Sequence, residues 1–109
     1  MSQQKTPPIY STCEDDPSQS DGIDRFVIGL AERVDCLQDA ELEDDLQQLR
    51  ALVTTLGDSA EALGYHPLAQ VAARVARACD DEKVDEARAA MVELTDISGR
   101  IRRGHRGAA

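Results

Sequence analysis

The sequence predicts an all-α fold, an up-down antiparallel four-helix bundle. The 109-residue chain has 41% hydrophobic residues, mostly Leu, Ala and Val, but only 3% aromatic residues, a composition typical of packed helices rather than strands. Apolar residues recur at spacings of three and four over four stretches, so each stretch can bury one helical face. The connections between these stretches are short, which makes neighbouring helices antiparallel.

The chain length predicts a single domain, because 109 residues can bury one modest core. Residues 1–8 lack periodicity and end in two prolines, so we expect a flexible lead there. The domain then covers residues 9–103, with Ile9 and Tyr10 lying across the end of the bundle, and residues 104–109 form a flexible tail.

The first helix is expected over residues 17–42. Asp16 suits the N-cap and Pro17 suits the first helical position, with Gln19 three residues after the cap. The apolar face of this helix consists of Ile23, Phe26, Val27, Leu30, Val34 and Leu37.

The second helix is expected over residues 46–63, after the acidic run at 43–45. That run has no Gly or Pro, so a continuous helix through it is a competing interpretation. A tight turn is favoured because Asp45, with Gln48 three residues later, is a capping signature. The apolar seam of this helix consists of Leu46, Leu49, Val53, Leu56, Ala60 and Leu63.

Gly64 and Pro67 mark the turn into a third helix over 67–79, since Gly suits a helix C-terminus and Pro a first turn. The fourth helix follows a turn at 80–83. The third helix directs Leu68, Val71, Ala72 and Val75 inward and Arg74 and Arg77 outward. The inward residues of the fourth are Val84, Ala87, Met91, Leu94, Ser98 and Ile101.

The net charge of −9 argues against a nucleic-acid partner, since that binding depends largely on Lys and Arg. The exception is a cluster of arginines near the C-terminus, Arg100, Arg102, Arg103 and Arg106. This cluster is either an arm for nucleic acid or an acidic partner or, as we favour, the cationic end of the last helix.

The three cysteines, Cys13, Cys36 and Cys79, form neither a disulfide framework nor a zinc pattern. The chain has no signal segment and no apolar run of membrane length. We therefore expect a cytoplasmic protein with no cofactor, no metal and no membrane partner.

A polar stripe beside the seam of the second helix is the candidate site. It follows helical spacing about a quarter to a third of a turn from the seam, where a partner can reach it. The residues expected to bind a protein partner are Arg50, Thr54, Gly57, Asp58 and Glu61.

Residues 53–64, VTTLGDSAEALG, resemble the acceptor segment of histidine phosphotransfer (HPt) domains, roughly A-H-x-L-K-G-x-A-x-x-x-G. The match has no gap and keeps Leu56, Ala60 and Gly64. Further matching segments are PIYS at 8–11, DDP at 15–17, Glu32-Arg33 and Pro67. The resemblance implies a four-helix bundle that exchanges phosphoryl groups with receiver and histidine kinase domains.

The departures from this pattern fall on the acceptor site. Thr54 stands where the family has its histidine, Gly57 where it has Lys, and Asp58 where it has Gly. An exposed imidazole can attack an aspartyl phosphate and pass the group onward, whereas a threonine hydroxyl is a poor nucleophile whose phosphate ester is too stable. Asp58 also adds bulk and negative charge beside an acidic receiver pocket. We therefore expect no enzymatic activity and no catalytic residue.

Other candidate sites are weaker. His66 is either a relocated acceptor or metal ligand or, as we favour, a turn residue that caps the third helix. His105 lies in the expected tail. Thr54 with Asp58 lacks the His, Lys or oxyanion donor that would complete a catalytic site. The carboxylates at 41–45 lack the order and the glycine of an EF-hand.

Two functions follow. The first is a non-catalytic HPt-like module of a two-component phosphorelay, which docks a response-regulator receiver domain or a histidine kinase through the flank of the first and second helices. The second is a structural or oligomerisation bundle, dimerised through the fourth helix. Phosphorylation of Thr54 by a serine/threonine kinase has no basic or proline-directed context to support it. We expect a monomer or a weak homodimer.

Overall fold

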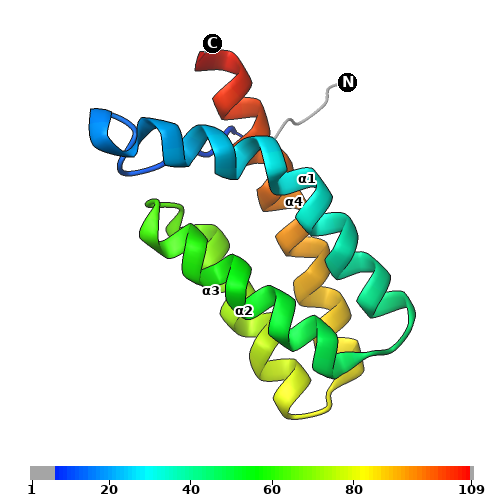
Figure 1. The fold of residues 1–109 in the computed structure, drawn as a ribbon. Helices are drawn as coiled ribbons and strands as arrows, with labels where there is room; N and C mark the ends of the chain where they lie inside the picture. Colours follow the sequence, from blue (N-terminus) through cyan, green and yellow to red (C-terminus); the bar gives the residue numbers. More distant parts are fainter. Residues whose placement is uncertain (1–6, 109) are drawn as a thin grey trace, which may run out of the picture.

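The computed structural model describes residues 7–108, and the side chains of residues 7–105. Its elements are a 3-10 turn (Pro17–Gln19), α1 (Ser20–Leu42), α2 (Leu46–Ala62), α3 (His66–Asp80) and α4 (Val84–Ala108). Each helix packs against its neighbour in the sequence, and α1 packs against α4 and so closes the bundle (Figure 1). The described residues include no strand. The predicted all-α four-helix bundle is confirmed.

The helix starts follow the capping residues. Asp16 accepts a hydrogen bond from the Ser18 N–H at 3.0 Å, but this cap begins the 3-10 turn, so α1 itself begins at Ser20. Asp45 accepts a hydrogen bond from the Gln48 N–H at 3.0 Å and caps α2. Asp44 has a φ of 56°, the left-handed conformation that a tight turn needs. The predicted turn between α1 and α2 is confirmed.

The core lies along the axis of the bundle and takes residues from all four helices. Its largest fully buried side chains are Leu30, Leu37, Leu49, Leu56, Leu68, Met91, Leu94 and Ile101. The predicted inward position of Val84 is wrong: this first residue of α4 is 37% exposed, because the core does not extend to that end of the helix. At the opposite end of the bundle, the ring of Tyr65 stacks on Phe26 of α1, with 5.6 Å between centroids.

Residues 7–13, here called the N-terminal strap, cross that end of the bundle and bind the α2–α3 turn. The Thr12 N–H donates to the Gly64 carbonyl at 3.0 Å, and the Ser11 hydroxyl donates to the Leu63 carbonyl. Gly64 has a φ of 83°, and a β-carbon there would lie 2.5 Å from the Thr12 hydroxyl oxygen. Glycine is therefore needed at this turn both for its conformation and for the space it leaves.

The strap also binds α4. The Ile9 N–H donates to the Arg100 carbonyl at 3.1 Å, and Arg100 Nε donates to the Pro7 carbonyl at 2.9 Å. A β-carbon on Gly104 would lie 2.7 Å from the Ile9 carbonyl oxygen, so the strap and the helix approach as closely as glycine allows. Ile9 packs against the core as expected, whereas Tyr10 is 52% exposed and does not plug the bundle.

Helix α4 differs from the expectation at its end. It continues to Ala108, through positions 104–108 for which a flexible tail was expected. Contacts of Arg100 and buried Gly104 with the strap hold these last turns in place. Residues 1–6 of the expected lead, and residue 109, lie outside the described residues. None of the helices in the described part of the chain combines the length and the apolar character needed to cross a membrane.

Candidate functional site

The register of α2 against α3 creates a groove beside Thr54. Gly57 lies against Ala72, where a β-carbon on the glycine would come within 3.1 Å of the alanine methyl carbon. At one end of the α2–α3 pair, a salt bridge joins Arg50 Nε of α2 to Asp80 Oδ1 of α3. The groove between the two helices has a volume of about 460 Å³.

Four of the five predicted binding residues line this groove from α2, three as its wall and Gly57 as its floor. Thr54, Asp58 and Glu61 are exposed along one wall. In the described part of the chain, the Thr54 hydroxyl takes part in no hydrogen bond, whereas the neighbouring Thr55 hydroxyl donates to the Ala51 carbonyl at 3.2 Å. The opposite wall comes from α3, so the groove beside these residues lies between α2 and α3. Docking on the flank of the first two helices stays a prediction.

The other two predicted residues have different roles. Gly57 is half-buried and forms the floor of the groove against Ala72, so its main contact is inside the protein. Arg50 does not line the groove, and its guanidinium is paired with Asp80 at the groove's end. This pairing leaves Arg50 less available to a partner than its sequence position suggests.

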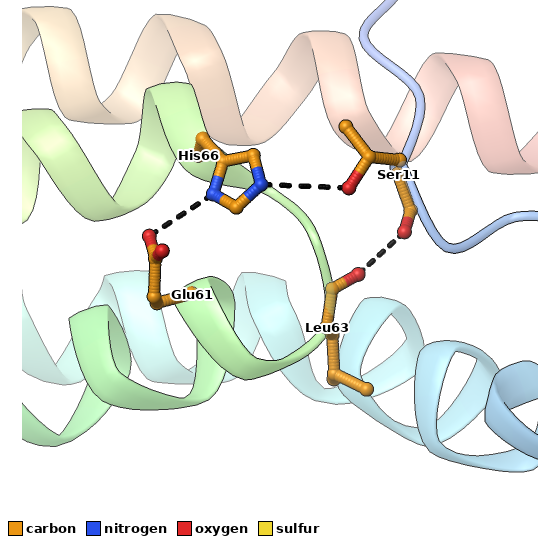
Figure 2. Close-up of polar contacts among 5 residues, drawn as sticks. Ser11, Glu61, Leu63 and His66 are labelled. Carbon is orange, nitrogen blue, oxygen red and sulfur yellow. Dashed lines mark hydrogen bonds and ion pairs between the residues drawn. The ribbon is translucent and has the colours of Figure 1, made fainter.

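His66 connects the end of the groove to the strap. Its Nδ1 lies 3.0 Å from Glu61 Oε1, and its Nε2 lies 3.4 Å from the Thr12 hydroxyl. Figure 2 shows the ring between Glu61 and the strap, beside the contact of Ser11 with the Leu63 carbonyl. The expected capping role of His66 is wrong: it is the first residue of α3, and the N-cap is Tyr65, which makes no side-chain cap. The imidazole instead makes polar contacts at the surface with Glu61 and Thr12.

The wall on α3 was missed by the sequence analysis. It is made of small side chains at helical spacing, Ala69, Ala72, Ala73 and Ala76, followed by Arg77. This spacing could have been found in the sequence, but these alanines were assigned to the core or left unassigned. Their small size leaves the groove open.

Arg77 differs from the arginines near it. Arg74 donates to Glu93 of α4 at 2.7 Å, and this hydrogen bond lowers the pKa of Glu93. Arg50 is paired with Asp80. Arg77 is exposed in the groove and forms no ion pair with any residue whose side chain is described. It is the cation on which a partner's negative charge can act.

The groove offers a hydroxyl, carboxylates and a guanidinium, but none of its lining residues is a histidine, cysteine or lysine. Cys79, on the same helix, is buried, and burial raises the pKa of its thiol, which disfavours the nucleophilic thiolate. Over the described residues, no three His, Cys, Asp or Glu side chains gather in a way that could hold a metal ion. These groups suit recognition of another surface.

Three comparisons with known proteins were made. The family model described as Hpt domain matches residues 22–104, which include most of α1, all of α2 and α3, and most of α4. Neither a curated protein nor a solved structure matches the chain. The matched span includes both walls of the groove.

Proposed function

This chain belongs to the Hpt domain family, and from that premise we propose that it is a non-catalytic signalling module of a two-component phosphorelay. It docks a receiver domain or a histidine kinase through the groove between α2 and α3, and does not itself accept the phosphoryl group. We expect it to act in the cytoplasm, as a monomer or a weak homodimer whose groove stays open.

The observation that carries this proposal is the environment of Thr54. Its hydroxyl is exposed on the groove. The resemblance of residues 53–64 to the acceptor segment of the family puts Thr54 where the family has its histidine. Transfer between aspartate and histidine needs an exposed imidazole nitrogen, and a threonine hydroxyl without an adjacent base cannot replace it. The neighbouring carboxylate of Asp58 would also repel an incoming phosphoryl group.

Docking without transfer is supported by the groove itself. It is open, its floor is made of glycine and alanine, and its rim carries charges of both signs. A surface of this kind can take an apolar ridge of a partner and orient it through the charged rim. Loss of the acceptor histidine leaves these features in place.

The first experiment separates docking from transfer. Purified wild-type chain is mixed with a panel of receiver domains and histidine kinase domains from the source organism, with and without radiolabelled phosphodonor. We expect at least one domain to bind, measured by calorimetry, and no acid-labile label on the chain. Phosphohistidine on this chain would refute the non-catalytic part of the proposal, and failure of every domain to bind would refute docking.

A variant locates the docking surface. Asp58→Arg should reduce binding of the same domain at least tenfold, because it reverses a charge on the groove wall. The matched control is Asp35→Arg, the same change at an exposed position on α1 away from the groove. Equal loss in both variants would place the docking surface elsewhere.

A second variant tests whether this groove derives from the acceptor site of the Hpt family. Thr54→His with Asp58→Gly should recover part of the phosphoryl acceptance, measured as acid-labile label. Gly57 is kept, because the β-carbon of a lysine there would press on Ala72. Complete inertness of a variant that folds and still docks would argue that this groove was not an acceptor site.

The alternative is an oligomerisation bundle with no phosphorelay role. Light scattering discriminates the two functions. A tight dimer that binds none of the receiver or kinase domains would favour the alternative.

A further inference from the structure

The groove has an ordered charge pattern along its length, which can be read from the helix register. Arg50 pairs with Asp80, and Gly57 lies against Ala72, so α2 and α3 run antiparallel. In this register, Arg77 of α3 lies opposite the helical turn of α2 that contains Thr54. Asp58 and Glu61 lie roughly 6–10 Å further along α2, from the rise of 1.5 Å per residue. Arg77 and the Arg50–Asp80 ion pair are therefore at one end of the groove, and the carboxylates of Asp58 and Glu61 are toward the other.

The charged residues of the groove differ in whether they already have a partner within the chain. Arg77 has no ion-pair partner among the residues described with side chains, and Asp58 has none either. Glu61 shares its carboxylate with His66 at 3.0 Å. The unsatisfied pair is Arg77 and Asp58, on opposite walls, with glycine and alanine between them.

On the premise of the proposed function, we propose that the occupant of the groove is an amphipathic helix of the docked receiver or kinase domain, with a carboxylate and a cation four to seven residues apart on one face. The carboxylate pairs with Arg77, and the cation pairs with Asp58 and reaches Glu61. Small or apolar residues between them lie on Gly57 and Ala72. A helix presents residues i, i+4 and i+7 on one face, which matches the spacing of these charges.

Charge complementarity is the reason to prefer this occupant. A uniformly acidic helix would be repelled by Asp58 and Glu61, and a uniformly basic helix would be repelled by Arg77. Each would therefore bind favourably at one end of the groove only. A second copy of this chain would present the same groove with the same charges. Its α2–α3 pair would have to lie antiparallel to that of the first copy before Arg77 and Asp58 could pair at both ends. A mixed-charge helix satisfies both ends in a single placement.

The experiment uses the domain that binds the wild-type chain best in the panel described above. Arg77→Glu should weaken its binding about tenfold, and the difference from wild type should shrink as salt rises. The control is Arg74→Glu, the same charge change one turn earlier on α3 but outside the groove, and its affinity should stay within twofold of wild type. Reversal of the partner's facing carboxylate to arginine should restore binding to Arg77→Glu.

The outcomes separate the two proposals. If no receiver or kinase domain binds the wild-type chain, the proposed function fails. If a domain binds but Arg77→Glu and Arg74→Glu weaken it equally, or neither does, docking stands and the mixed-charge helix is refuted. Cross-linking that places a partner loop or strand in the groove would refute it as well. Circular dichroism of each variant checks that the bundle is intact.

Discussion

Two regions of the molecule depend on glycine, but one is closely packed and the other is an open groove. At the end of the bundle, Gly64 and Gly104 let the strap approach so closely that a β-carbon at either position would overlap it. Along the groove, a β-carbon on Gly57 would meet the methyl group of Ala72 at 3.1 Å and the Ala69 carbonyl oxygen at 3.9 Å, and a space of about 460 Å³ remains beside it. The same residue type therefore closes one surface and leaves another accessible.

The hydrogen bonds of the two regions differ in the same way. Backbone groups of the strap are paired with α4 and with the α2–α3 turn. In the groove, the Thr54 hydroxyl and the charges of Asp58 and Arg77 have no partner among the residues described with side chains. Satisfied polar groups rigidify a region, and unsatisfied exposed groups can be satisfied by a partner. The strap therefore contributes stability, while the groove keeps polar groups that remain open to a partner.

The largest effect that would test this comparison is expected for Gly64→Ala. The left-handed backbone is strained for alanine, and the added carbon would displace the strap and break its hydrogen bonds to the turn. We expect a loss of about 3–4 kcal/mol in the free energy of unfolding. Urea denaturation measures it. A loss below about 1 kcal/mol would mean that the strap moves easily and is no firmer than the groove.

Alkaline pH should produce the next largest effect. Burial raises the pKa of Tyr65 from 10.0 to about 12, with help from the nearby charges of Glu14 and Asp24. The folded state therefore retains the phenol proton more strongly than the unfolded state, so the contribution of Tyr65 to stability is complete below about pH 10 and is lost as pH rises from 10 toward 12. The full loss is about 2–3 kcal/mol.

Tyr65→Phe is the control for this titration. Urea midpoints at pH 8 and pH 11.5 are compared for the two proteins. Burial also raises the pKa of the Cys79 thiol, but both proteins contain Cys79, so the difference between them isolates the phenol. An equal alkaline loss in both proteins would contradict the assignment.

The smallest effect is expected for Gly57→Ala, the same chemical change in the groove. Alanine gains about 1 kcal/mol in helix propensity over glycine, and the contact of 3.1 Å with Ala72 offsets it. We expect the free energy of unfolding to change by no more than about 0.5 kcal/mol in either direction. A loss as large as that of Gly64→Ala would show that the α2–α3 seam is packed as rigidly as the strap end.

Local signals in the sequence were enough for the fold. Apolar spacing located four helices, and the cap at Asp45 and the glycine at Gly64 located two of the turns. Periodicity identifies the buried face of a helix but not which neighbour covers its flank, so the groove that α3 forms beside Thr54 was not predicted. That choice depends on how the helices pack.

The candidate site was predicted in part for the same reason. Thr54, Asp58 and Glu61 follow from their position on α2, but the pairing of each arginine depends on the register between helices. Arg50 meets Asp80 only because of that register, and it is also what leaves Arg77 in the groove. The continuation of α4 to Ala108 was not expected from its local sequence, and the strap that contacts this helix at Arg100 is far away in the sequence. The inability of Thr54 to accept a phosphoryl group stays a prediction.

The contact between Ile9 and Arg100 places the beginning of the described chain beside its last helix (Figure 1). This proximity makes the bundle suitable for circular permutation. A flexible linker of roughly half a dozen residues could join the two ends, and the chain could be reopened in the Asp81–Lys83 turn. Such a rearranged chain would keep both groove helices continuous and would reveal whether assembly of the bundle depends on the order in which its helices are made.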